Sequence, residues 1–132
     1  MTLTTWSFVS AMVRPTFLVA EPEPEQALSA RKLVIETAKF NVITAHSEHE
    51  AIELLEKFPA VHAVIVHSEI KDFENIVEHA RERGNRLPTI LLSARKGMQN
   101  LAVDHQLSSH EPQQLVDLLR NLFGDPRVID GK

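Results

Sequence analysis

Four polar residues each follow a short segment that we expect to form a strand, where they could take part in chemistry: Glu21, His67, Ser93 and Ser108. His67 is the most informative of them, because the residues before it, 63–66, are all apolar and predict a buried strand. An imidazole at the end of such a strand could accept a phosphoryl group, ligate a metal ion or change its charge near neutral pH. The simpler interpretation is a partly buried histidine that only fills space.

The elements that must position these residues alternate between strands and helices. We expect strands at 16–20, 40–45, 63–66, 89–92 and 102–107, and helices at 26–39, 47–58, 72–84 and 112–124. Ser47 with Glu50 forms a capping box, and Asp72 is the expected N-cap of the next helix. The alternation predicts an α/β fold with a doubly wound, five-stranded parallel sheet in the flavodoxin-like order 2-1-3-4-5. In such a sheet the site lies at the carboxyl ends of the strands.

Composition restricts the classes of protein that the chain can belong to. The 132 residues fit one domain, which we place at 15–124, between an N-terminal extension at 1–14 and a C-terminal tail at 125–132. The net charge of -4 predicts no basic surface for nucleic acid. The chain has no cysteine and no apolar run long enough to span a membrane, so we expect a cytoplasmic protein without disulfides.

The extension carries Trp6 and Phe8 but lacks the basic leading residues and the long apolar run of a signal peptide. Two aromatic side chains in so short a segment are expected to find apolar cover. We therefore expect the extension to pack either on its own domain or on a second copy of the chain. The second arrangement would be a homodimer.

With these residues in this order, the chain resembles the receiver domain of two-component response regulators, the CheY-like fold, over residues 15–123. Receivers carry an acidic pair after the first strand, a phosphorylated Asp after the third, Thr or Ser after the fourth and Lys-Pro after the fifth. The corresponding residues here are Glu21 with Pro22, His67, Ser93, and Ser108 with Ser109. Only Ser93 matches the receiver pattern. The resemblance therefore implies a degenerate receiver, or pseudo-receiver.

Each of these substitutions removes part of the phosphoryl-transfer chemistry. Transfer to a receiver needs a carboxylate nucleophile and a Mg²⁺ ion held by oxygen ligands, whereas His67 supplies a nitrogen. Ser108 replaces the lysine whose cation would pair with the phosphoryl oxygens. The resemblance implies a non-enzymatic bacterial signalling module that needs no cofactor and is not phosphorylated in this pocket. Its partners would be signalling proteins, such as a histidine kinase or another regulator.

The resemblance also implies an altered partner face. His105 stands at the position on the fifth strand where receivers carry an aromatic switch residue. Only residues 94–107 separate Ser93 from Ser108, fewer than in receivers, so the helix between the fourth and fifth strands should be shortened or missing. We expect the segment around Trp6 to cover the apolar sheet surface that this loss exposes.

A second interpretation is a small switch that responds to a ligand or a metal ion bound at the strand ends. Its metal ligands would be Glu21, His67 and His105, which we expect at the same edge of the sheet. His46 and His49, near a predicted helix start, form another conceivable metal pair. For this pair, exposed histidines without a ligand are the simpler interpretation.

Two further features could be functional but also have simpler structural interpretations. Glu21, Glu23 and Glu25 alternate with prolines in a loop that could bind a cation or a basic partner, although a solvated loop stiffened by proline is the simpler interpretation. Ser93 near His67 is a nucleophile next to a base, but no third acidic residue accompanies them. None of the four glycines directly follows the first strand, where a phosphate-binding loop would need one. An enzyme is therefore the least favoured class.

Overall fold

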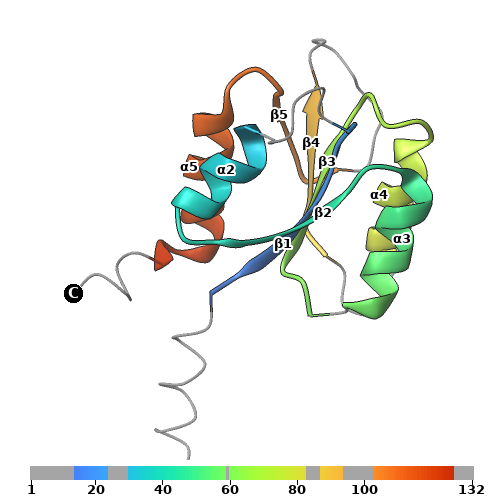
Figure 1. The fold of residues 1–132 in the computed structure, drawn as a ribbon, viewed down its shortest axis with the longest axis horizontal. Coiled ribbons are helices and arrows are strands. Elements are labelled where there is room, and N and C mark those ends of the chain that lie inside the picture. The colour runs from blue at the N-terminus through green and yellow to red at the C-terminus, as the bar shows by residue number, and fades with distance from the viewer. Residues whose placement is uncertain (1–13, 24–29, 59, 83–86, 94–102, 127–132) are drawn as a thin grey trace, which may run out of the picture.

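The computed structural model describes residues 14–23, 30–58, 60–82, 87–93 and 103–126 (Figure 1). Its centre is a sheet of five parallel strands in the order β2-β1-β3-β4-β5. The strands are β1 (Thr16–Ala20), β2 (Asn41–Ala45), β3 (Ala63–His67), β4 (Thr89–Ser93) and β5 (His105–Ser108). The expected flavodoxin-like strand order is confirmed.

Helices cover both faces of this sheet. They are α2 (Ala30–Thr37), α3 (Glu48–Lys57), α4 (Phe73–Arg81) and α5 (Pro112–Phe123), labelled as in Figure 1. Helices α2 and α5 lie together on one face, and α3 and α4 lie together on the other (Figure 1). This is the doubly wound arrangement that right-handed crossovers between parallel strands produce.

The core is divided into two layers because successive strand residues point to opposite faces. On β1, Phe17 and Val19 belong to the cluster under α2 and α5, whereas Leu18 and Ala20 belong to the cluster under α3 and α4. All five residues of β3 and of β4 are buried. Strands buried on both faces appear in the sequence as continuous apolar runs, which is why they could be recognised.

The two predicted helix caps have different outcomes. The Ser47 hydroxyl accepts a hydrogen bond from the backbone N–H of Glu50 at 3.1 Å, and the Glu50 carboxylate accepts one from the N–H of His46 at 2.7 Å. The capping interaction is therefore confirmed. Asp72 is the N-cap residue of α4, as predicted, but its side chain makes no capping hydrogen bond. Its left-handed backbone, with φ 60° and ψ 33°, differs from the extended conformation that N-caps normally adopt.

The connection between β4 and β5 is short. Strand β5 begins at His105 instead of residue 102 as predicted, and Val103 and Asp104 before it are not helical. Any helix in this connection is thus short or absent, as expected, although residues 94–102 lie outside the described part of the chain.

Several other expectations fall on residues that the structure does not describe. These are the placement of the extension at 1–13, the first residues of the helix expected from 26, the acidic Glu25 and the end of the tail at 127–132. None of the helices within the described ranges is long and apolar enough to cross a membrane.

Candidate functional site

The register of the parallel strands brings four of the expected residues to one edge of the sheet. Glu21 follows β1, whose last residue Ala20 pairs with Val66 of β3. His67 is the last residue of β3, and Ser93 ends β4 opposite Ser108 of β5. Backbone hydrogen bonds continue the pairing just past the strands, from the Ser109 N–H to the Ser93 carbonyl at 3.1 Å. The predicted cluster at the carboxyl ends is therefore present.

His105 does not belong to this cluster. It is the first residue of β5 and pairs with Ile90, near the opposite, amino-terminal edge of the sheet. The expectation that Glu21, His67 and His105 share one edge is wrong, because β5 starts later than predicted and His105 stands at its beginning. In the described ranges no group of three His, Asp or Glu side chains lies close enough to hold a metal ion. The metal-switch interpretation thus loses its proposed ligands.

Glu21 is only 3% exposed and forms an ion pair with Arg31, which reaches it from α2. The same guanidinium donates a hydrogen bond to the backbone carbonyl of Ser109 at 3.2 Å. Arg31 thus joins the ends of β1 and β5 across the site. A carboxylate buried next to a guanidinium has its charge compensated within the protein, so Glu21 is a poor ligand for an added cation.

Sequence reasoning missed Arg31, although a signal was present. Arg31 lies four residues before Ile35, and residues four apart share one face of a helix. Ile35 is completely buried against the sheet. A charged residue on that buried face of the predicted helix needed a partner, and Glu21 at the end of the preceding strand was the nearest acid that the fold could supply.

His67 is held as a neutral imidazole. Its side chain lies at the buried end of β3, and its Nδ1 accepts a hydrogen bond from the backbone N–H of Glu69 at 3.0 Å. Burial lowers the pKa of His67 below 6.5, the charge of Arg31 lowers it further, and the carboxylates of Glu69 and Glu21 oppose these effects. Because Nδ1 is the acceptor, the neutral ring carries its proton on Nε2. Neither nitrogen presents a free lone pair to an incoming electrophile.

The remaining site residues have structural roles. Ser93 is buried at the end of β4, and Pro22 is half-buried directly after Glu21. The Ser108 hydroxyl accepts a hydrogen bond from the backbone N–H of His110 at 3.2 Å, so it stabilises the turn after β5. It does not replace the charge of a lysine.

The two histidines near the start of α3 have different surroundings. His46 places its Nδ1 3.1 Å from the backbone carbonyl of Glu21, so it contacts the rim of the site. His49 is exposed on α3. Glu23, the second acid of the loop after β1, is also exposed.

A protein-family model described as the N-terminal domain of Orn/Lys/Arg decarboxylases matches residues 25–115. The chain belongs to this family. The matched region contains the polypeptide from α2 to the start of α5, and thus includes Arg31, His67 and Ser93. Comparison with curated proteins finds no match.

Several solved structures that are similar to this chain are described as response regulators or their receiver domains. A receiver domain of a Francisella response regulator covers 83% of this chain and 96% of its own, with a TM-score of 0.70 and 19% identity. A sensor protein from Polaromonas has a TM-score of 0.69 and 23% identity, covering 83% of this chain and 95% of its own. The structure of an atypical orphan response regulator has a TM-score of 0.66 and 11% identity, covering 80% and 92%. The predicted CheY-like receiver fold is confirmed.

Proposed function

We propose that this chain is a receiver-like protein-interaction module whose strand-end pocket does not accept a phosphoryl group. The observation that carries the proposal is the Arg31–Glu21 ion pair beside a neutral His67. The pocket of a working receiver concentrates negative charge that binds a divalent cation. Here the acid that follows β1 is paired with a fixed cation from the protein itself.

The chemistry of phosphoryl transfer explains why this matters. The transferred group carries negative charge that a Mg²⁺ ion must neutralise, and Mg²⁺ is held by carboxylates, water and the phosphate oxygens. A guanidinium next to Glu21 repels a divalent cation and already uses the carboxylate. His67 would have to give up its hydrogen bond with the Glu69 N–H to use Nδ1 as a nucleophile. Both requirements oppose phosphorylation.

A module of this kind would signal by binding. The printed title of one similar structure, an atypical orphan response regulator, describes a phosphorylation-independent regulatory mechanism, so the fold is compatible with such a role. Another similar structure is a receiver, CheY6 of R. sphaeroides, in complex with the P1 domain of CheA3. We propose by analogy that this chain is a cytoplasmic, non-enzymatic domain of a bacterial two-component pathway, and that its partner is a histidine kinase or another regulator.

The family match favours a second candidate. Because the chain belongs to a family named for the N-terminal domain of Orn/Lys/Arg decarboxylases, its partner could instead be a decarboxylase of basic amino acids. In this role the domain would associate with an enzyme without carrying out its chemistry. Co-purification distinguishes the two candidates. Size-exclusion chromatography with light scattering, run with a histidine kinase and separately with such a decarboxylase, shows which protein the chain joins.

Phosphorylation can be tested directly. The chain is incubated with acetyl phosphate and Mg²⁺, and its intact mass is measured at neutral pH, where a phosphohistidine survives. We expect the mass to stay unchanged, because His67 offers no free lone pair and Glu21 is paired with Arg31. A gain of one phosphoryl group that His67→Ala abolishes would overturn the proposal.

A further inference from the structure

Helices α2 and α5 lie side by side on one face of the sheet (Figure 1), and a groove of about 430 Å³ lies between them. The buried side chains of Ala38, directly after α2, and of Val116 on α5 are among its lining residues. Leu33 stands on the α2 side of the groove and is 54% exposed, more than any other large apolar side chain in the described ranges. An apolar recess and a projecting apolar side chain are therefore neighbours on one surface.

This combination fits a second copy of the same chain. In a twofold symmetric dimer each surface meets an identical surface, so it must carry both the projecting part and the recess that receives it. An apolar cavity of about 150 Å³ holds a benzene ring, so the groove has room for the smaller side chain of a leucine. A partner of another kind would fill the recess but would need a recess of its own for Leu33. A second copy supplies both.

The direction of the two helices decides how such copies can meet. Arg31, in the first turn of α2, donates a hydrogen bond to the carbonyl of Ser109, just before α5, at 3.2 Å. Ala38 and Arg120, near the ends of the same helices, line one groove. Helices α2 and α5 are therefore parallel. A twofold axis along the groove then places α2 of one copy over α5 of the other, in the same direction.

The spacing along the helices also places opposite charges together. Glu36 lies three residues after Leu33 on α2, and Arg120 lies four residues after Val116 on α5. With a rise of about 1.5 Å per residue, these separations are about 4.5 Å and about 6 Å. When Leu33 of one copy lies over Val116 of the other, Glu36 therefore comes close to Arg120.

Both charged groups have capacity for such a contact. Glu36 is exposed, and no ion pair within the described ranges involves it. In the same part of the chain, Nε of Arg120 has no hydrogen-bond partner and lies 3.7 Å from the Asp125 carboxylate, and Nη1 lies 3.9 Å from that of Asp117. Both distances are longer than a hydrogen bond, so the guanidinium can still donate to a carboxylate of a second copy.

We propose that the chain forms a twofold symmetric dimer through the groove between α2 and α5. In this dimer Leu33 of each copy enters the groove of the other, and Glu36 of each copy pairs with Arg120 of the other. The surface uses neither Glu21 nor His67, so the proposal is independent of the function assigned to the carboxyl edge of the sheet.

The dimer predicts a dissociation constant that depends on Leu33. Sedimentation velocity of the full chain between about 10 μM and about 1 mM should show the mass rising from that of one chain toward that of two. Leu33→Ser removes the projecting apolar side chain and should raise the dissociation constant about tenfold or more. Phe58→Ser, a change of a comparably exposed side chain directly after α3, is the matched control and should leave it unchanged. Circular dichroism checks that both variants are folded.

An exchange of charges tests how the two copies are oriented. Glu36→Arg and Arg120→Glu each place like charges at both contacts, so each variant alone should be monomeric at concentrations where the wild type is a dimer. In an equimolar mixture every contact again joins opposite charges, and dimers should reappear. Circular dichroism checks the fold of each variant. Glu53→Arg, on the exposed surface of α3, is the control and should dimerise like the wild type.

Three results would overturn the proposal. The first is a wild-type chain whose mass is that of one copy at every concentration. The second is a dimer whose dissociation constant does not change with Leu33→Ser, or two charge variants that stay monomeric when they are mixed. The third is a monomeric chain that loses its co-purification with a histidine kinase or a decarboxylase through Leu33→Ser, since the groove would then bind that protein.

Discussion

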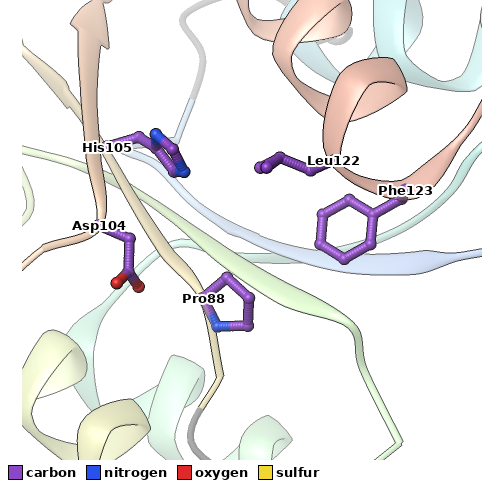
Figure 2. Close-up of a pocket in the computed structure, with 5 residues that line it drawn as sticks. All are labelled: Pro88, Asp104, His105, Leu122 and Phe123. Atoms are coloured by element: carbon purple, nitrogen blue, oxygen red, sulfur yellow. The ribbon is translucent and has the colours of Figure 1, made fainter.

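The two edges of the sheet differ in how they use their polar residues. At the carboxyl edge Glu21, His67 and Ser93 are buried, and the first two make hydrogen bonds or ion pairs within the protein. At the amino edge Asp104 is exposed although it pairs with Thr89, and Asp104, His105, Leu122 and Phe123 are among the residues that line an open hollow (Figure 2). Polar groups at the carboxyl edge, where parallel sheets usually bind ligands, are therefore paired within the protein, whereas the amino edge has an open hollow. The place of a residue in the fold indicates where a binding site can form. Hydrogen bonds and ion pairs within the protein then decide whether the polar groups there can bind a ligand.

The strongest test of this difference is Arg31→Ala at the carboxyl edge. Removing the guanidinium takes away the cation that is paired with the buried Glu21 carboxylate, and the loss of one member of a buried ion pair costs about 3 kcal/mol of unfolding free energy. Urea denaturation followed by circular dichroism measures the change.

The matched control for Arg31→Ala is Lys57→Ala. Lys57 lies 3.9 Å from Glu53 on the exposed surface of α3, where an ion pair contributes about 0.5 kcal/mol or less. If both variants lose equally little stability, Glu21 is not held by Arg31 and the carboxyl edge is not closed as described.

A smaller effect is expected from Asp104→Ala at the amino edge. The Asp104 carboxylate accepts hydrogen bonds from the N–H of Thr89 at 2.8 Å and from its hydroxyl at 3.3 Å. Thr89 is completely buried, so its N–H would be left without an acceptor at a cost of about 1.5 kcal/mol. Asp104→Asn keeps an acceptor oxygen, so its free energy of unfolding should decrease clearly less than that of Asp104→Ala in the same urea titration. Equal losses for the two variants would show that this hydrogen bond does not stabilise the edge.

The smallest expected effect is a pH dependence at His67. Its pKa is lowered in the folded protein by burial and by Arg31, so the folded state binds a proton less readily than the unfolded state. The contribution of neutral His67 to the free energy of unfolding is fully present above the pKa of the unfolded chain, 6.5. It is lost as the pH falls through the lower pKa of the folded protein. When the pH is lowered from about 7 to about 5, the free energy of unfolding should decrease less for His67→Asn than for the wild type, as measured by urea titration.

His79→Asn is the control for this measurement, because His79 lies on α4 away from the site. It should keep the pH dependence of the wild type. A wild-type stability profile indistinguishable from that of His67→Asn would mean that the imidazole is as easily protonated in the folded chain as in the unfolded one.

Much of the fold was predictable because it depends on short-range patterns. The apolar run before His67 identified β3, and the cap formed by Ser47 and Glu50 located the start of α3. Strands buried on both faces and amphipathic helices leave such patterns in any sequence. Their alternation restricts the topology to few possibilities, and the observed order is one of them.

The parts that could not be predicted depend on tertiary contacts. Asp104 hydrogen-bonds Thr89 directly before β5, and His105 is the first residue of that strand, which the local sequence did not indicate. The left-handed backbone of Asp72 is a conformation that aspartate adopts more readily than most residues, but no neighbouring residue indicated it at this position. The pairing of Arg31 with Glu21 is also a tertiary contact, although the place of Arg31 on the buried face of its helix indicated that it needed a partner. No motif in the chain indicated the decarboxylase family, whose match extends over residues 25–115.

If the chain acts as the interaction module proposed above, the guanidinium that joins Glu21 to the Ser109 carbonyl has a consequence for regulation. A pocket that carries its own permanent counter-charge does not depend on how much magnesium the cell contains. If kinases cannot charge it either, its shape stays constant through the life of the molecule. Any signal that depends on its binding to a partner would then vary only with the concentration of the protein, which gene expression and turnover determine.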